Sequence, residues 1–267
     1  MCFTLRANYV NIFKGGKMSK QNIYDKKEFF DGYQNMRGQQ INANNLIEKP
    51  QMIEMLPNDV SGMSILDLGC GSGGLSKLLS DAGAKYVLGT DISKNMINEA
   101  NKIAVKGKLE FKVIAMEEID QIHKKFDMVV SSLAFHYVKD FEKLIKDISN
   151  LLKPNGLLVF SQEHPIRTCP IYDKAQTKHV EIDGKRYFLI SDYQNMSKRV
   201  YNWDGIGVEK YHRTTEYIIN TLHSSKLIIE HIMPSYATKK AIKLVDKYKY
   251  QADSPYYLYI RAKKSAK

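Results

Sequence analysis

The sequence predicts an α/β protein built on an open, doubly wound and mostly parallel sheet. Strand-like and helix-like segments alternate from about residue 64 to residue 161, which is typical of parallel strands joined by right-handed crossovers. The 267 residues are 43% hydrophobic, enough for one large domain with a full core. We therefore expect a single domain over residues 21–267, preceded by a basic, disordered tail over residues 1–20.

The first part of that domain is expected to be a helical N-terminal cap (residues 21–60), followed by a cofactor-binding core (residues 61–165). Four apolar residues of the cap recur near helical spacing: Phe29, Phe30, Tyr33 and Met36. In the core, short apolar runs predict strands at residues 64–68, 86–90, 109–114, 126–131 and 157–161. Helices are expected between them at residues 74–82, at 93–105 with Ser93 as the N-cap, and at 141–152, stopped by Pro154-Asn155-Gly156.

Residues 166–211 break this alternation and are too many for an ordinary loop. Within them, residues 180–190 predict a hairpin around Asp183-Gly184, a favoured two-residue turn. We expect this segment to be an inserted lid over the mouth of the active site. Residues 212–267 are expected to complete a seven-stranded sheet, with a helix at 214–223 and strands at 227–232 and 256–261.

The segment Ile65–Gly74, ILDLGCGSGG, is the most informative about function. A short apolar run stops at a cluster of glycines, and leucines follow at helical spacing. Strand, glycine loop and helix in this order form a nucleotide site at the carboxyl edge of open α/β sheets, because glycine lets a ligand approach the bare main chain. Gly69, Gly71 and Gly74 also satisfy G-x-G-x-x-G, the dinucleotide fingerprint, so the loop alone leaves the ligand open.

Two carboxylates narrow the choice of ligand. Asp67 precedes the first glycine of the loop, where a carboxylate suits a cation and repels a pyrophosphate. Asp91 ends the second expected strand, 20 residues after Gly71, where a carboxylate can take both hydroxyls of a ribose. A ligand with a ribose and a positive group but no phosphate fits both, and S-adenosylmethionine has these properties.

The pattern D-x-G-x-G-x-G, followed by the acidic residue of GTDIS, resembles the class I S-adenosylmethionine-dependent methyltransferases of the small-molecule, methyltransferase type 11-like branch. The likeness spans about residues 65–160. It includes FDMVVSSLAFHYV (Phe126–Val138) and continues into LLKPNGLLVFSQEHP (Leu151–Pro165). The resemblance implies a Rossmann-like sheet whose last strand is antiparallel and inserted beside the fifth. It also implies S-adenosylmethionine as the cofactor.

The same resemblance implies a set of cofactor-binding residues at the strand ends. They are Asp67, Gly69, Cys70, Gly71, Asp91, Ile92, Met96, Ala115, Met116, Glu117, Ser132 and Leu133. Many relatives have Asp where this chain has Ala115, so the adenine amino group needs another acceptor here. Two positions keep a structural alternative, since Asp67 could stabilise the loop and Met96 could belong to the helix core.

Methyl transfer from an activated cofactor needs mainly alignment and desolvation, with a general base only where the acceptor carries a proton. His136, Glu163 and His164 follow the fourth and fifth strands and are candidate catalytic residues, although a structural role is the alternative for a lone histidine. Aromatic and basic residues in or after the insertion could bind the acceptor, or could form a small core of the lid. They are Tyr172, Tyr193, Trp203, His212 and Arg213. The histidines and cysteines lack the spacing of a zinc site.

Composition bears on location and partners. The three cysteines show no paired spacing, which favours a reducing compartment, and no apolar run approaches the length of a membrane span; we expect a cytoplasmic protein. The net charge of +11 is compatible with RNA binding or with lysine-rich, solvated helix faces. The run Lys14-Gly15-Gly16-Lys17 suggests a ribosome-binding site in the coding sequence, which would make Met18 the natural start.

The leading interpretation is a methyltransferase that uses S-adenosylmethionine on a small molecule enclosed by the lid. An RNA methyltransferase is an alternative, although Ser131-Ser132-Leu133-Ala134 stands where an N-P-P-[YF] motif would follow the fourth strand. A nicotinamide-dependent oxidoreductase is disfavoured by Asp67. A non-catalytic module that binds S-adenosylmethionine is the third alternative. The oligomeric state and the accepting atom stay open.

Overall fold

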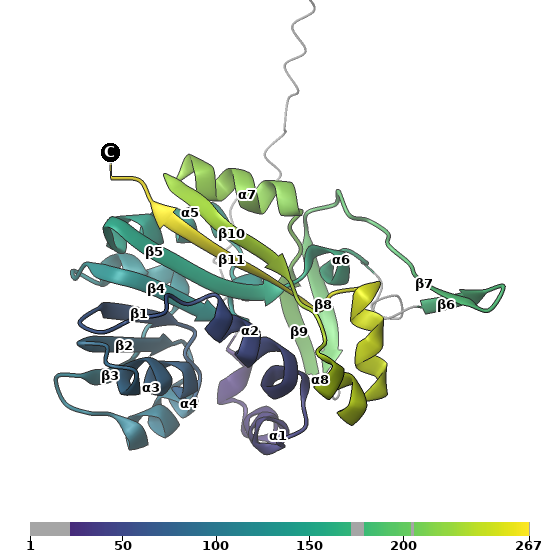
Figure 1. The fold of residues 1–267 in the computed structure, drawn as a ribbon. Coiled ribbons are helices and arrows are strands. Elements are labelled where there is room, and N and C mark those ends of the chain that lie inside the picture. The colour runs from purple at the N-terminus through teal and green to yellow at the C-terminus, as the bar shows by residue number, and fades with distance from the viewer. Residues whose placement is uncertain (1–21, 172–178, 204–205, 267) are drawn as a thin grey trace, which may run out of the picture.

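The computed structural model, which describes residues 22–171, 179–203 and 206–266, contains a seven-stranded sheet in the order β10-β11-β5-β4-β1-β2-β3 (Figure 1). The strands of this sheet are β1 (Ser64–Leu68), β2 (Tyr86–Asp91), β3 (Leu109–Val113), β4 (Phe126–Ser132), β5 (Leu152–Glu163), β10 (Leu227–Pro234) and β11 (Tyr257–Lys264). Strand β11 is antiparallel to both of its neighbours, β5 and β10, whereas the pairs among β1 to β5 are parallel. The expected Rossmann-like fold, with the last strand inserted beside the fifth, is confirmed.

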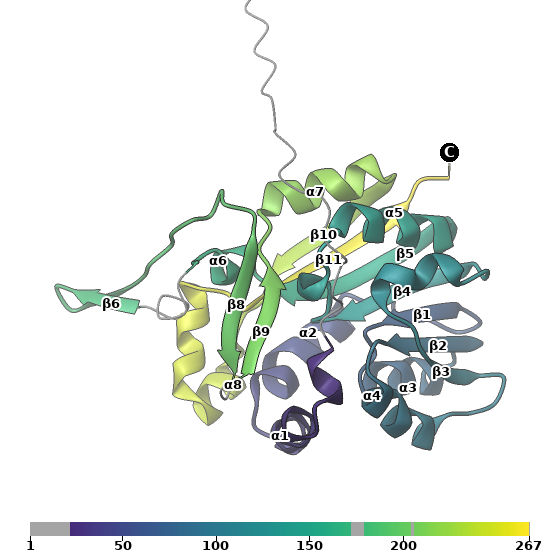
Figure 2. The same ribbon diagram turned by 180° about the vertical axis from the view of Figure 1, so that it is seen from behind.

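Helices cover both faces of the sheet. On one face lie α2 (Lys49–Glu54), α3 (Gly74–Asp81) and α4 (Lys94–Ala100), and on the other α5 (Phe141–Leu151) and α7 (Thr215–Ser224) (Figures 1 and 2). Each layer has its own apolar core: Met52, Leu79 and Ile97 pack on the first face, and Ile148 and Leu222 on the second. The two helical layers hold the sheet between them, so that the carboxyl ends of its parallel strands lie at one edge.

The boundaries of the core elements follow local signals in the sequence. Strand β1 spans the expected residues 64–68, and the Ser93 hydroxyl caps α4 by accepting a hydrogen bond from Met96 N at 3.2 Å. The expected helix over residues 93–105 ends earlier, at Ala100, and continues as the turn η3 (Asn101–Ile103). Strand β5 begins at Leu152 and includes Pro154-Asn155-Gly156, where Asn155 has φ 63°.

The N-terminal cap is helical, as expected, and consists of η1 (Ile23–Asp25), α1 (Lys27–Gly38), η2 (Asn44–Glu48) and α2. Its first turn is tied to the start of α4. Asp25 Oδ1 accepts a hydrogen bond from the Ser93 hydroxyl at 2.7 Å and another from Asn95 N at 3.1 Å. The cap thereby lies over the carboxyl edge of the sheet.

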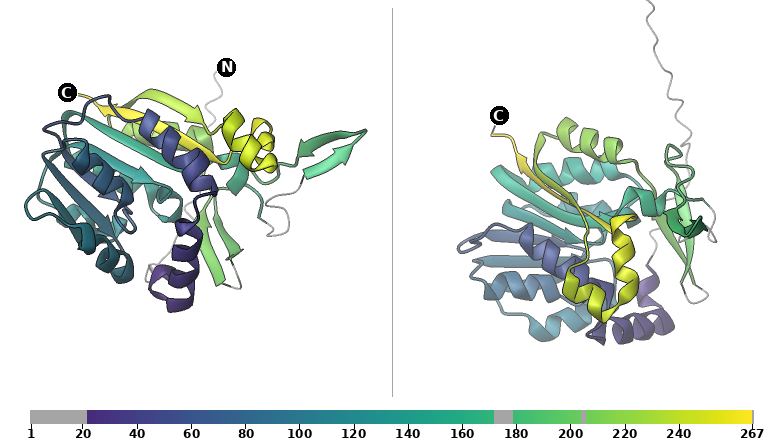
Figure 3. Two further views of the ribbon diagram at one scale, coloured as in Figure 1. Left: turned by 60° about the horizontal axis from the view of Figure 1, so that its bottom comes forward. Right: turned by 45° about the vertical axis from the view of Figure 1, so that its right-hand side comes forward.

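The inserted segment contains α6 (Pro165–Thr168) and two hairpins, β6 (His179–Ile182) with β7 (Lys185–Phe188), and β8 (Lys198–Trp203) with β9 (Ile206–Tyr211). The first hairpin was expected, and its turn residues Asp183 and Gly184 have φ 50° and 72°; it projects from the body of the molecule (Figure 3). The second was not expected. It packs against the cap through Val208, which is buried with Ile23 and Phe29.

Other elements complete the chain: η4 (Met116–Gln121), η5 (Phe135–Tyr137), α8 (Lys239–Leu244) and η7 (Asp246–Ala252). The last two lie between β10 and β11, where no helix was expected. Across the described ranges, none of the helices combines the length and the apolar character needed to traverse a membrane. The basic tail, Met18 and Tyr172 lie outside the described residues.

Candidate functional site

The loop after β1 is a tight turn of bare main chain. Gly69, Gly71 and Gly73 have φ values of 71°, 54° and 84°, a region that side chains disfavour. The amides of Gly69 and Cys70 donate to Thr90 O at 2.8 and 2.9 Å, which fastens the turn to the end of β2. A methyl group on Gly69 would lie 2.6 Å from Ala134 Cβ, so glycine is required there.

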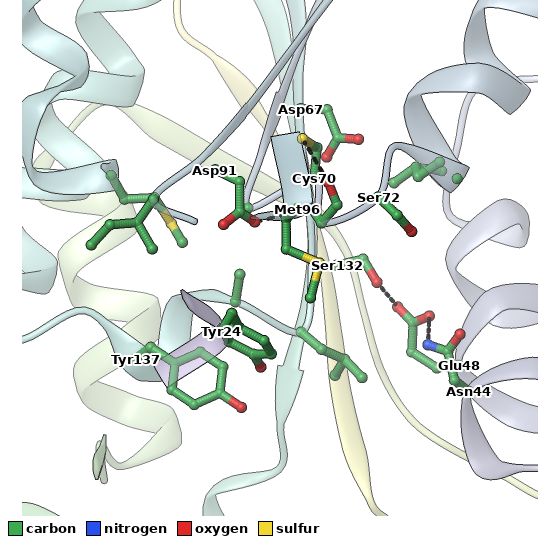
Figure 4. Close-up of a pocket in the computed structure, with 18 of the residues that line it drawn as sticks. Tyr24, Asn44, Glu48, Asp67, Cys70, Ser72, Asp91, Met96, Ser132 and Tyr137 are labelled. Carbon is green, nitrogen blue, oxygen red and sulfur yellow. Dashed lines mark hydrogen bonds between the residues drawn. The ribbon is translucent and has the colours of Figure 1, made fainter. Parts of the chain in front are cut away.

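A cavity of about 280 Å³ opens beside this turn, at the carboxyl edge of β1, β2 and β4 (Figure 4). Apart from Ala115, which lies between two lining residues, every residue expected to bind the cofactor lines it. Those residues are Asp67, Gly69, Cys70, Gly71, Asp91, Ile92, Met96, Met116, Glu117, Ser132 and Leu133. The structure therefore brings these residues together at one site, while the role of each stays a prediction.

Asp91 is held in place at the end of β2 by main-chain donors. Its Oδ2 accepts from Gly71 N at 3.0 Å, and its Oδ1 accepts from Ser93 N at 2.9 Å. Burial raises the pKa of the Asp91 carboxyl, although these two amides lower it in part. Because a carboxylate offers about four acceptor positions, both oxygens can also accept from ligand hydroxyls in the cavity.

Asp67 lies deeper, with 1% of its surface exposed. Its Oδ2 accepts a hydrogen bond from the Ser76 hydroxyl at 2.6 Å. Burial raises the pKa of Asp67 to about 7, and the neighbouring carboxylates of Asp91 and Glu48 add to the rise. A cation placed beside Asp67 would favour its ionised form, since an opposite charge at short range stabilises a carboxylate.

The opposite wall of the cavity comes from the N-terminal cap, and sequence reasoning missed it. Its lining residues are Ile23, Tyr24, Asn44, Asn45, Glu48, Lys49 and Met52. Glu48 is 2% exposed, and its Oε1 accepts from the hydroxyls of Ser132 at 2.7 Å and Ser161 at 2.6 Å. Its Oε2 accepts from the Asn44 amide at 3.0 Å. No local spacing could reveal this cluster, because Glu48 and Ser161 are 113 residues apart.

The candidate catalytic residues form a second cluster that does not line the cavity. His136 is 3% exposed, and its Nδ1 accepts from Glu163 N at 3.4 Å; burial lowers the pKa of His136 to about 3. Burial raises the pKa of Glu163, but the ammonium of Lys210, with which it pairs, brings the net shift below the usual value. His164 caps α6 by accepting from Ile166 N at 3.3 Å, and burial lowers its pKa to about 4.

The expected acceptor-binding residues are also dispersed. His212 is hydrogen-bonded to the Thr168 hydroxyl and to Tyr193 O, each at 2.8 Å. Arg213 donates to the carbonyl oxygens of Phe135 and Val138, beneath η5. Neither lines the cavity, and Trp203 ends β8. The catalytic and acceptor-binding roles stay predictions. Within the described ranges, no group of three or more His, Cys, Asp or Glu residues is arranged to hold a metal ion.

Comparison with known proteins adds to this geometry. A family model described as a methyltransferase domain matches residues 66–160. The crystal structure of an S-adenosylmethionine-dependent methyltransferase from Mesorhizobium loti is 32% identical, with a TM-score of 0.73 over 86% of this chain and 100% of that chain. An uncharacterized protein of Haemophilus influenzae is 36% identical over 255 residues, which are 93% of this chain and 99% of the relative.

A more distant structure resembles the chain in fold alone. The magnesium protoporphyrin IX methyltransferase of Synechocystis, solved with bound S-adenosylmethionine, is 18% identical, with a TM-score of 0.57 over 91% of this chain and 94% of that chain.

Proposed function

The chain belongs to the S-adenosylmethionine-dependent methyltransferases, and from this premise we propose that it methylates a small molecule held between the sheet and the N-terminal cap. The observation that carries the proposal is the two-sided lining of the cavity, with Asp67 and Asp91 on the sheet side and Tyr24 and Glu48 on the cap side. A cavity closed in this way can exclude water from a small acceptor.

We propose that the glycine loop and the strand ends hold the cofactor. Asp91 would accept from the ribose hydroxyls, Asp67 would pair with the ammonium group, and the main chain at Gly69 and Gly71 would lie along the methionine part. The donor set fits this molecule, because it offers carboxylates to a ribose and a cation. When bound, S-adenosylmethionine supplies a methyl group on a sulfonium, which is already activated for transfer.

The protein then has to align the acceptor and keep water out. Ser132 and Leu133 at the end of β4 are proposed to lie beside the transferred methyl group. Leu133 has φ 53° and is fixed by a hydrogen bond from its amide to Ser161 O at 3.0 Å. Backbone held in a sparsely populated conformation is common at functional sites, and here it rigidly sets the wall against which the acceptor would lie.

The test uses the purified protein with S-adenosylmethionine labelled in the methyl group. Calorimetry should show binding of S-adenosylmethionine and none of NAD. Incubation with a metabolite extract freed of macromolecules should release S-adenosylhomocysteine and place the label in a small molecule. A parallel incubation uses total RNA in place of the metabolite extract. Label in the RNA alone would overturn the small-molecule assignment. Binding of S-adenosylmethionine without turnover on the extract or on the RNA would favour a non-catalytic module.

A further inference from the structure

We propose that Glu48 binds the methyl acceptor and that the acceptor is a small amine. This inference rests on the proposed function, since it concerns the part of the same cavity that is lined by the cap and not by the proposed cofactor-binding residues. Glu48 is the carboxylate that the cap contributes to the cavity lining. It was not among the residues that the sequence indicated.

Glu48 is built into the site and is held in one orientation. The side chain is almost fully buried, yet it lines the cavity. Taking a carboxylate out of water costs several kcal/mol, and here hydrogen bonds from Ser132, Ser161 and Asn44 offset that cost. These three donors satisfy acceptor positions on both carboxyl oxygens and so fix the orientation of the group. A carboxylate held at a cavity wall is suited to a ligand that carries a positive charge or an N–H group.

The order of the strands places Glu48 on the acceptor side. Asp91, proposed to hold the ribose, ends β2, whereas Ser132 ends β4 and is paired in register with Ser161 near the end of β5. The glycine loop follows β1, which lies between β2 and β4. A cofactor that runs from Asp91 along the loop points its methyl end toward β4. Ser132 reaches from there toward Glu48 and Asn44, which come from the cap (Figure 4).

The charge of the cavity contrasts with that of the chain. The whole sequence carries +11, but the described lining holds four carboxylates and a single cationic side chain. They are Glu48, Asp67, Asp91, Glu117 and, as the cation, Lys49. Bound S-adenosylmethionine brings a sulfonium, an ammonium and a carboxylate, a net charge of one, so the occupied site stays negative. Such a site repels carboxylic acids and phosphates and attracts a cation, and the rings of Tyr24 and Tyr137 in the same lining tolerate one.

The step that follows is an in-line displacement. The lone pair of the amine nitrogen forms the new N–C bond while the C–S bond breaks, and the electrons of that bond stay on sulfur. One proton per turnover leaves the nitrogen for solvent, so that a protonated amine becomes a protonated methylamine. Glu48 accepts a hydrogen bond from the nitrogen and orients it toward the methyl group.

The first test needs no variant. A metabolite extract freed of macromolecules is separated by cation and anion exchange, and each fraction is incubated with methyl-labelled S-adenosylmethionine and the wild-type protein. Label is expected in the fraction retained by the cation exchanger. Turnover confined to the anionic or the neutral fraction would overturn the amine assignment while leaving the methyltransferase function intact. Absence of S-adenosylmethionine binding would instead defeat the proposed function itself.

The second test separates the acceptor from the cofactor. With the active fraction, Glu48→Gln is expected to raise the acceptor KM by about 10- to 100-fold, the effect of losing a hydrogen bond to a charged group, while the Kd for S-adenosylmethionine changes by less than about twofold. Glu54→Gln is the matched control on the same cap. Among the contacts described, Glu54 accepts a hydrogen bond only from the exposed Tyr236 hydroxyl, at 3.0 Å. The acceptor KM and the cofactor Kd of this variant should stay at the wild-type values. A rise in the cofactor Kd with an unchanged acceptor KM would place Glu48 in the cofactor site and overturn the inference.

Discussion

The two walls of the cavity are built in different ways. On the sheet wall, the loop and the ribose carboxylate are joined locally: Asp91 accepts from Gly71 N across 20 residues of chain, and the turn after β1 adds Gly69, Cys70 and Ser72 to the lining. The cap wall is assembled over long distances, since Glu48 reaches Ser161 across 113 residues. Contacts between residues close in sequence leave a spacing that can be read in the chain, and here that spacing predicted the cofactor. A wall assembled from distant segments can differ between chains, and it is where the acceptor would be selected.

The largest expected effect concerns the support of the long-range wall. Lys210 of β9 is 6% exposed and pairs with Glu163 at the end of β5, so Lys210→Met leaves the partly buried carboxylate of Glu163, 24% exposed, without this partner. Loss of one member of a buried pair costs about 3–5 kcal/mol; because water reaches part of Glu163, we expect the free energy of unfolding in urea to fall by the lower figure, about 3 kcal/mol. The double variant Lys210→Met/Glu163→Gln should recover most of the loss.

The matched control for this pair lies on the neighbouring strand. Lys198 of β8 pairs with Glu209 at 2.7 Å, but both side chains are partly exposed. An exposed pair contributes about 0–1 kcal/mol, so Lys198→Met should change the stability very little. Equal losses for Lys198→Met and Lys210→Met would show that the pair between the inserted segment and the sheet stabilises the fold no more than an exposed pair does.

The local wall is tested by Gly69→Ala. The added methyl group would lie 2.6 Å from Ala134 Cβ on a backbone with positive φ. Gly107 has φ 75° and open space around the same position, so Gly107→Ala measures the backbone strain alone. We expect Gly69→Ala to be less stable than Gly107→Ala by about 1–3 kcal/mol, the cost of overpacking, and to lose binding of S-adenosylmethionine in calorimetry. Retained binding would mean that the turn can shift without harming the site.

This difference between the walls also explains what could be predicted from the sequence. The strands of the core and the Ser93 cap follow from signals within a few residues, and both were expected. The cavity-lining strand ends were expected from the resemblance to class I methyltransferases. The helix expected to be stopped by Pro154-Asn155-Gly156 already ends at Leu151. Those three residues belong to β5, because pairing with β4 begins at Leu152 and extends the strand across Asn155. No sequence pattern near Glu48 indicates that it lines the cavity, because its position depends on hydrogen bonds to Ser132 of β4 and Ser161 of β5.

The inserted segment shows an intermediate case. Asp183-Gly184 indicated the first hairpin, and Asp204-Gly205, the same kind of pair, stands between β8 and β9 in the sequence, so a signal for the second hairpin was present and was missed. The segment was expected to cover the site directly. None of its described residues lines the cavity; instead Val208 packs against Ile23 and Phe29 of the cap. Its role as a lid stays a prediction.

Asp91→Ala is expected to act on cofactor binding. The carboxylate would be lost as an acceptor for the ribose, and we expect calorimetric affinity for S-adenosylmethionine to fall by about 1–3 kcal/mol, the scale of a hydrogen bond involving a charged group. Asp81→Ala is the control, because Asp81 is exposed on α3 and pairs only with Lys77 among the contacts described. An unchanged affinity for S-adenosylmethionine in Asp91→Ala would contradict the proposed contact between Asp91 and the ribose.

An effect confined to a window of pH concerns the charge of Asp67. Burial raises the pKa of Asp67 from 3.8 to about 7 in the folded chain. Between these two pH values the Asp67 carboxyl is therefore protonated in the folded state and ionised in the unfolded state. The burial cost of the carboxylate is therefore absent at low pH and grows as the pH rises toward about 7. In urea unfolding without cofactor, Asp67→Asn should gain stability relative to the wild type between pH 5 and pH 7, by about 1–3 kcal/mol.

Cofactor binding should show the opposite dependence on pH. The ammonium group pairs with the ionised form of Asp67, so the proton must leave on binding, and affinity for S-adenosylmethionine should rise about tenfold from pH 5.5 to pH 7, below the range where an α-amino group titrates. Calorimetry in buffers of different ionisation enthalpy should detect the released proton, and both signals should vanish in Asp67→Asn. If the variant keeps the wild-type pH slope, the proton comes from another group, and the local wall recognises the cofactor through Asp91 and the main chain without help from Asp67.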